Sequence, residues 1–169
     1  MSKLLILGLC LLLLTFIGSS SEDTQTFDTA FGKAQLNIPE GFEIKDPNNE
    51  NVIQFVLPGT EKPVISVVVD NTEIYGSDLE KYASAHFGEG KRYEDTKTND
   101  NHIMHFYDRN DYGDAHEYSG IIDFADDKGA IVNVFGRSET VAYGRVLATF
   151  TKDEFLNICK SFTFLDENE

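Results

Sequence analysis

The chain has 169 residues, with 29 acidic against 14 basic side chains and a formal net charge of −15. A surface of this charge repels the phosphates of nucleic acids and anionic lipid headgroups, so we exclude nucleic acid as a partner. The length suits one domain built around one core.

Residues 1–21 have the order of a secretory signal peptide. Lys3 precedes an apolar run of 14 residues, Leu4–Ile17, and a small polar patch follows at 18–21. A membrane-spanning helix needs about 20 residues, so the segment is predicted to direct export. Because glycine and serine stand where alanines are expected at a cleavage site, an uncleaved N-terminal anchor helix is the alternative. We expect a secreted or extracytoplasmic protein that meets the membrane only through an uncleaved N-terminus.

The rest of the chain is predicted to hold a polar spacer at 22–26, one α+β domain at 27–165 and an acidic tail at 166–169. Cleavage after Ser21 leaves 13 basic against 29 acidic side chains, a net charge of −16. Turn residues separate three expected strands, at 31–38, 52–57 and 63–70. The last of these contains a continuous β-branched run, which is typical of a central strand covered on both faces.

A helix is predicted next, because Ser77 and Glu80 have the spacing of a capping box. Its apolar residues recur at helical spacing and form one stripe. They are Leu79, Tyr82, Ala83, His86 and Phe87. Gly88 is expected to end the helix.

Four further strands are predicted at 92–98, 102–108, 116–124 and 130–136. Short segments rich in Asn, Asp and Gly separate them, which indicates an antiparallel meander.

The chain closes with a second capping box, Thr151 to Glu154, and a second apolar stripe. The stripe consists of Phe155, Ile158, Cys159 and Phe162. Because Cys159 shares this stripe, we expect a buried structural thiol rather than a reactive one. A short final strand is expected at 162–165.

Strands, helix, strands and helix in one chain favour an α+β domain with a mainly antiparallel sheet. The segment Ile38-Pro39-Glu40-Gly41-Phe42 and the closing helix through Phe155–Phe164 resemble the Mog1/PsbP-like group over most of residues 27–165. The resemblance implies a six- or seven-stranded antiparallel sheet flanked by helices. It also implies a binding or assembly module without enzymatic chemistry. No functional residue of that group is carried over.

The densest polar cluster gives a candidate binding loop. Its residues are Asp108, Asn110, Asp111, Tyr112 and Asp114. Asp108, Asn110 and Gly113 fall at the first, third and sixth positions of an EF-hand loop, but Tyr112 and Ser119 occupy the fifth and twelfth positions, where oxygen ligands are needed. A hairpin loop is therefore favoured over a weak cation site, and the metal is left unknown.

Other chemical motifs are missing from the sequence. The four histidines have no metal-ligand spacing, and neither a nucleophile elbow nor a phosphate-binding loop occurs. No cofactor is expected. We expect an exported, non-enzymatic binding or assembly module of the cell envelope, acting on an unknown protein or small ligand. The alternatives are an extracytoplasmic hydrolase that uses acidic residues and a weak cation-binding envelope protein.

Overall fold

A computed structural model describes residues 22–45, 50–60, 62–72, 78–87, 94–97, 103–112 and 115–166. Within these ranges, the side chains of residues 80, 86, 87, 94–97, 103–112, 115 and 142 are not described. The predicted signal or anchor segment, residues 1–21, lies outside the described residues. Within the described part, none of the helices has the length and apolar character needed to cross a membrane.

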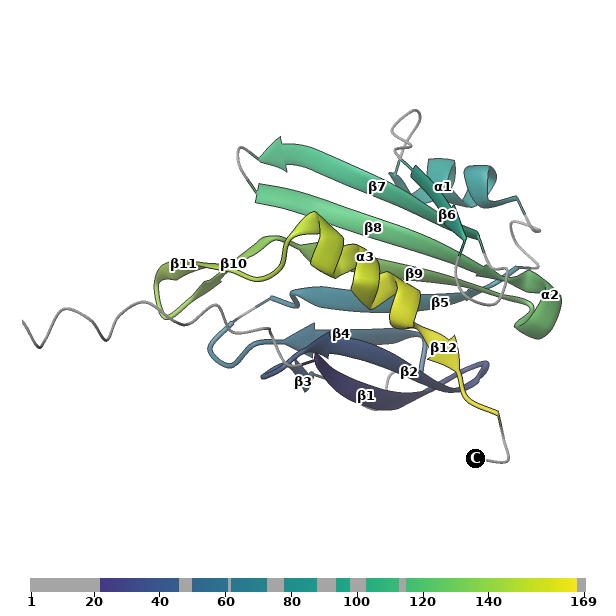
Figure 1. Cartoon of the computed structure of the whole chain (residues 1–169), viewed down its shortest axis with the longest axis horizontal. Coiled ribbons are helices and arrows are strands. Elements are labelled where there is room, and N and C mark those ends of the chain that lie inside the picture. Colours follow the sequence, from purple (N-terminus) through teal and green to yellow (C-terminus); the bar gives the residue numbers. More distant parts are fainter. Residues whose placement is uncertain are drawn as a thin grey trace, which may run out of the picture.

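Antiparallel strands make up most of the described chain, in three sheets (Figure 1). The largest has seven strands in the order β3-β4-β5-β9-β8-β7-β6. These strands are β3 (Glu43–Ile44), β4 (Val52–Val56), β5 (Ile65–Asn71), β6 (Glu94–Lys97), β7 (Ile103–Tyr112), β8 (Ala115–Phe124) and β9 (Ala130–Arg137). The order β9-β8-β7-β6 confirms the predicted meander.

Two smaller sheets hold the remaining described strands. One has the order β1-β2-β12, and the other is the two-stranded ribbon β10-β11. Their bounds are β1 (Glu22–Thr29), β2 (Gly32–Pro39), β12 (Thr163–Phe164), β10 (Glu139–Ala142) and β11 (Arg145–Ala148). The helices are α1 (Leu79–Phe87), the single turn α2 (Ala125–Lys128) and α3 (Lys152–Ser161).

The prediction of an α+β domain with mainly antiparallel strands is confirmed, but the expectation that the strands form a single sheet needs correction. The described strands are divided among three sheets, because β2 pairs with β1 on one side and with the final strand β12 on the other. The small sheet therefore unites the first and last described strands, and none of its described strands pairs with a strand of the seven-stranded sheet.

Residues 22–26, predicted as a polar spacer, form the first part of β1. The alternation of exposed and buried side chains places only Phe27 and Thr29 of this strand in the interior. An edge strand needs few apolar residues, because its backbone hydrogen bonds to β2 supply the pairing. The polar composition therefore concealed the strand.

The main core lies between the seven-stranded sheet and a layer formed by α3 and the three-stranded sheet. Alternate residues of the central strands face it, as the strand period of two requires. From β5 these are Ile65, Val67 and Val69, which are at most 2% exposed. On the opposite face, α1 packs over Ile121 and Ile131 through Leu79, Tyr82 and Ala83.

The expectation that β5 is covered on both faces is wrong for half of its residues. Its alternate residues Ser66, Val68 and Asp70 are only half-buried. Helix α1 covers this second face near Ile121 and Ile131 and reaches Asp70, whose carboxylate accepts a hydrogen bond from the Tyr82 hydroxyl at 2.7 Å, whereas the part around Ser66 and Val68 is open. We call it the open face.

Helix α3 begins as predicted. The Thr151 hydroxyl accepts a hydrogen bond from the Glu154 backbone N–H at 3.3 Å, and the Glu154 carboxylate accepts one from the Thr151 backbone N–H at 2.7 Å. Its predicted apolar stripe, Phe155, Ile158, Cys159 and Phe162, is at most 5% exposed.

Helix α1 begins one residue later than its predicted capping box. The Asp78 carboxylate accepts a hydrogen bond from the Lys81 backbone N–H at 3.0 Å, and the Asp78 carbonyl accepts one from Tyr82 N–H at 3.1 Å. These bonds identify Asp78 as the N-cap. Ser77 lies outside the described residues, as do the side chains of His86 and Phe87.

Replacing Asp78 with alanine should lower the free energy of unfolding by about 0.5–2 kcal/mol, because the Lys81 N–H then loses its cap. Thermal denaturation of the purified protein measures this loss. Asp78→Ser, which keeps an acceptor at the same place, should retain most of the stability. Equal losses in the two variants would contradict the assignment.

Candidate functional site

The open face carries rows of side chains that the strand register brings together. In antiparallel sheets, paired residues place their side chains on the same face. Gln54 pairs with Ser66, and Ser66 pairs with Phe135 on the next strand. One row further along, Glu117 pairs with Arg137. The strands β4, β5, β9 and β8 therefore contribute side chains to one surface.

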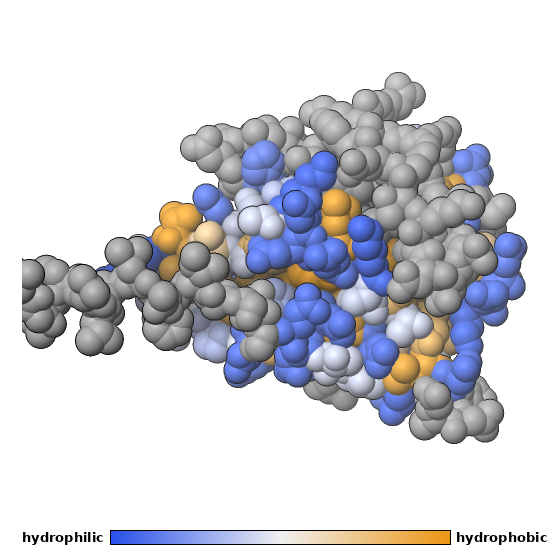
Figure 2. All heavy atoms as spheres, viewed as in Figure 1, coloured by the Kyte–Doolittle hydropathy of each residue, from blue (hydrophilic) through white to orange (hydrophobic). Residues whose placement is uncertain are grey.

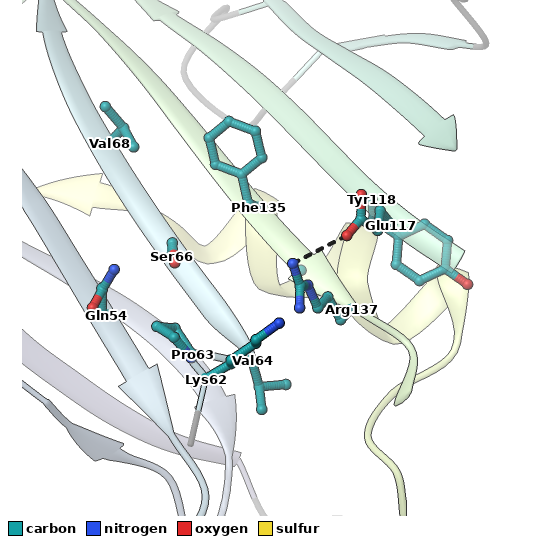
Figure 3. Close-up of a pocket in the computed structure, with 11 residues that line it drawn as sticks. Gln54, Lys62, Pro63, Val64, Ser66, Val68, Glu117, Tyr118, Phe135 and Arg137 are labelled. Carbon is teal, nitrogen blue, oxygen red and sulfur yellow. Dashed lines mark ion pairs between the residues drawn. The ribbon is translucent and has the colours of Figure 1, made fainter. Parts of the chain in front are cut away.

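These rows form the floor of a groove with a cavity volume of about 410 Å³. The polar residues Gln54 and Ser66 and the apolar residues Val68 and Phe135 line it, and Lys62 and Arg137 lie at its end (Figure 3). A volume of this order falls within the range of small-molecule sites.

Two cationic side chains converge at the end of the groove. Lys62 reaches in from the segment before β5, and Arg137 from the end of β9 (Figure 3). The Arg137 guanidinium is held by the Glu117 carboxylate at 3.2 Å, with the two side chains 46% and 36% exposed. Within the described part of the chain, Lys62 forms no ion pair. Lys62, Arg137 and Glu117 are the charged residues that line this cavity and have a net charge of +1, while Glu139 lines the adjoining cavity together with Lys62 and Arg137.

A second cavity of about 490 Å³ adjoins the first, and Lys62 and Arg137 line both. Its other wall is the β10-β11 ribbon, through Val141 and Tyr143. Tyr143 and Gly144 form the turn with φ values of 51° and 72°, the positive pair that a type I′ hairpin turn requires. Asparagine or glycine is usual at the first of these positions, whereas tyrosine is disfavoured in this backbone conformation.

The β10-β11 ribbon is unusually apolar for its exposure. It carries Val141, Tyr143, Val146 and Leu147, which are 39–79% exposed and are the exposed large hydrophobic residues among those described. Figure 2 shows an apolar group where the ribbon lies in Figure 1. The Tyr143 ring lies over Gly59 and leaves no room for a Cβ atom there. The ribbon therefore forms an apolar rim beside the cationic end of the groove.

A polar pair lies in the same sheet face, one row beyond Phe135. Asn133 is fully buried, and its side-chain oxygen accepts a hydrogen bond from the Ser119 hydroxyl at 2.7 Å. Its Nδ2 group has no partner in the described structure. An unpaired buried amide costs about 1–3 kcal/mol, so this face is not optimised as an ordinary apolar core.

The candidate loop predicted from the sequence is described only in part. The backbone of Asp108, Asn110, Asp111 and Tyr112 belongs to β7, and the pairing with β8 shifts register between Arg109 and Tyr112. Their side chains, and the whole of Asp114, lie outside the described residues. Among the residues that the structure does describe, no group of three His, Cys, Asp or Glu side chains could hold a metal ion.

Cys159 is fully buried in the main core, as predicted. Burial raises the pKa of its thiol far above the ordinary value, which outweighs the opposing effect of a backbone hydrogen bond. The thiol is therefore part of the packing beneath α3, on the other side of the sheet from the groove.

This burial should make stability depend on pH in the alkaline range. The unfolded thiol ionises near pH 8.5, while the folded thiol stays protonated to a higher pH. The stabilisation that comes from burying the protonated thiol is complete below about pH 8 and is lost as the pH rises. Relative to Cys159→Ala, the wild-type free energy of unfolding should fall by up to about 1.4 kcal/mol per unit above pH 8.5. A pH-independent difference between the two proteins would contradict this burial.

Sequence reasoning missed the residues of the groove. Lys62, Glu117 and Arg137 are far apart in the chain and meet only through the pairing of β5, β8 and β9. The sequence offered one partial signal, the polar Ser66 within the otherwise apolar run at 64–69. No protein-family model matches the chain, and no curated protein matches it at a significant level.

Proposed function

We propose that the chain is an exported, non-enzymatic binding or assembly module of the cell envelope, of Mog1/PsbP-like type, that holds its ligand or partner on the open face. The groove with its cationic end carries this proposal. The signal-like order of residues 1–21 supports export, and the antiparallel α+β architecture is compatible with the resemblance.

The side chains of the groove are suited to holding a ligand. Phe135 and Val68 offer an apolar floor, Gln54 and Ser66 offer hydrogen bonds, and Lys62 and Arg137 offer charge. A mostly apolar surface with a few convergent polar groups is the usual composition of a binding site. The Glu117 carboxylate orients Arg137, so its role in the site is positioning.

Two measurements on the protein from its native source test the proposal. Mass spectrometry should find a mature N-terminus between Ser19 and Thr24, whereas an intact Met1 in washed membranes would replace export by anchoring.

A photo-reactive amino acid at position 66 in the groove should then crosslink a ligand or partner in the native envelope. The same group at position 33, on the exposed side of β2, is the control. Equal crosslinking at both positions, or none at 66, would contradict the proposed site.

A further inference from the structure

We propose that the groove binds a small monocarboxylate with an apolar body, an inference that rests on the proposed function and names its ligand class. Lys62 and Arg137 hold the carboxylate, and the apolar body lies over Phe135 and Val68.

The charges favour an anion at the cationic end. Both cavities share Lys62 and Arg137, and Figure 3 shows the two side chains extending toward the same space. Glu117 neutralises one of the two charges, and a guanidinium with five N–H donors retains donors after that pair is made. In a strongly acidic protein, the lining of the first cavity thus keeps a net charge of +1, with Glu139 on the side of the second cavity, and a carboxylate is the complement of that charge.

The register sets the direction and length of the ligand. Phe135 lies two residues from Arg137 on β9, and Val68 pairs with Asn133, two residues further along the same strand. Four residues of strand span about 13 Å. A ligand that lies along β9 with its carboxylate beside Arg137 therefore covers Phe135 and reaches Val68. The charged end and the apolar end of the site thus lie in one line.

The volume favours a small molecule over a polypeptide. The cavity of about 410 Å³ is at the lower end of the range of small-molecule sites. We therefore assign the site to a free acid rather than to the C-terminus of a protein partner.

Octanoate is the probe. The controls are acetate, which has the carboxylate without the apolar chain, and octylammonium, which has the chain without the carboxylate. We expect octanoate to shift the backbone NMR signals of Val68 and Phe135 in a saturable titration, and both controls to bind at least about tenfold more weakly. An apolar tripeptide with a free C-terminus tests the other occupant. Saturation by the peptide and not by octanoate would overturn the assignment to a small acid.

Two lysine variants test whether octanoate binds at the cationic end of the groove. Lys62→Met should weaken octanoate binding about tenfold, because it removes one charge-assisted hydrogen bond. Lys33→Met makes the same change at an exposed lysine on β2, paired with Asp28 at 3.7 Å, and should leave binding unchanged. Equal losses in the two variants, or none in either, would overturn the proposal. If position 66 still crosslinks a native ligand while octanoate fails to bind, the ligand class is wrong and the proposed function stands.

Discussion

Replacing Phe155 with alanine should lower the free energy of unfolding by about 3–5 kcal/mol, the usual cost of removing a fully buried aromatic ring. Phe155 is fully buried on α3. Its ring stacks on Tyr118 at a centroid distance of 5.2 Å and on Phe150 at 5.6 Å. The side chain thus joins the last helix to β8 and to the segment before α3.

Thermal denaturation measures this effect. In a domain of this size, a loss of about 4 kcal/mol lowers the melting temperature by roughly 10 °C. Tyr143→Ala is the matched control, since it also removes an aromatic ring, but one that is 79% exposed. We expect a change within about 0.5 kcal/mol for the control. Similar losses in both variants would show that the core around Phe155 is misplaced.

Local patterns predicted the elements that are strongly amphipathic or capped. Helix α3 was predicted from residues within one short window, because its cap bonds Thr151 to Glu154 and its stripe follows the helical repeat. Strand β9 was likewise predicted from the mostly apolar residues that follow the turn at 126–129, and it is buried from Ala130 to Val134. In these segments the local preference agrees with the tertiary packing, which is why the sequence alone suffices.

The elements that the sequence did not predict have weaker local signals. The β10-β11 ribbon was missed because its turn uses Tyr143-Gly144 rather than the common Asn-Gly, and its apolar residues are exposed. The helix cap at Asp78 was assigned to the neighbouring Ser77 because both residue types are good N-caps. The hydrogen bonds that Asp78 accepts from the backbone N–H groups of Lys81 and Tyr82 distinguish the two positions.

The groove could not be predicted, because it depends on register. A shift of one residue in the pairing of β8 with β9 would move Arg137 away from Glu117 and place them on opposite faces. The sequence contains both residues but does not specify their partners. By contrast, the dense polar run around Asp111 could be identified from the sequence, since its residues are adjacent in the chain.

Replacing Gly136 with alanine should lower the free energy of unfolding by about 3 kcal/mol, at the upper end of the cost of overpacking. An added Cβ would lie 2.5 Å from Phe155 and 2.7 Å from Phe150, and these rings already pack against each other. Gly136 lies inside β9, so the close approach of the rings, and not a turn, requires glycine there.

A double-mutant cycle tests this explanation, because Phe155→Leu makes room for the new methyl group. Combined with Phe155→Leu, Gly136→Ala should cost less than it does alone, with a coupling energy of about 1 kcal/mol or more in chemical denaturation. The exposed Lys33→Met substitution should show no coupling to Gly136→Ala. Strict additivity of Gly136→Ala and Phe155→Leu would contradict the contact between this strand and α3. The cycle thus measures directly the packing that holds the last helix against the sheet, on the side opposite the groove.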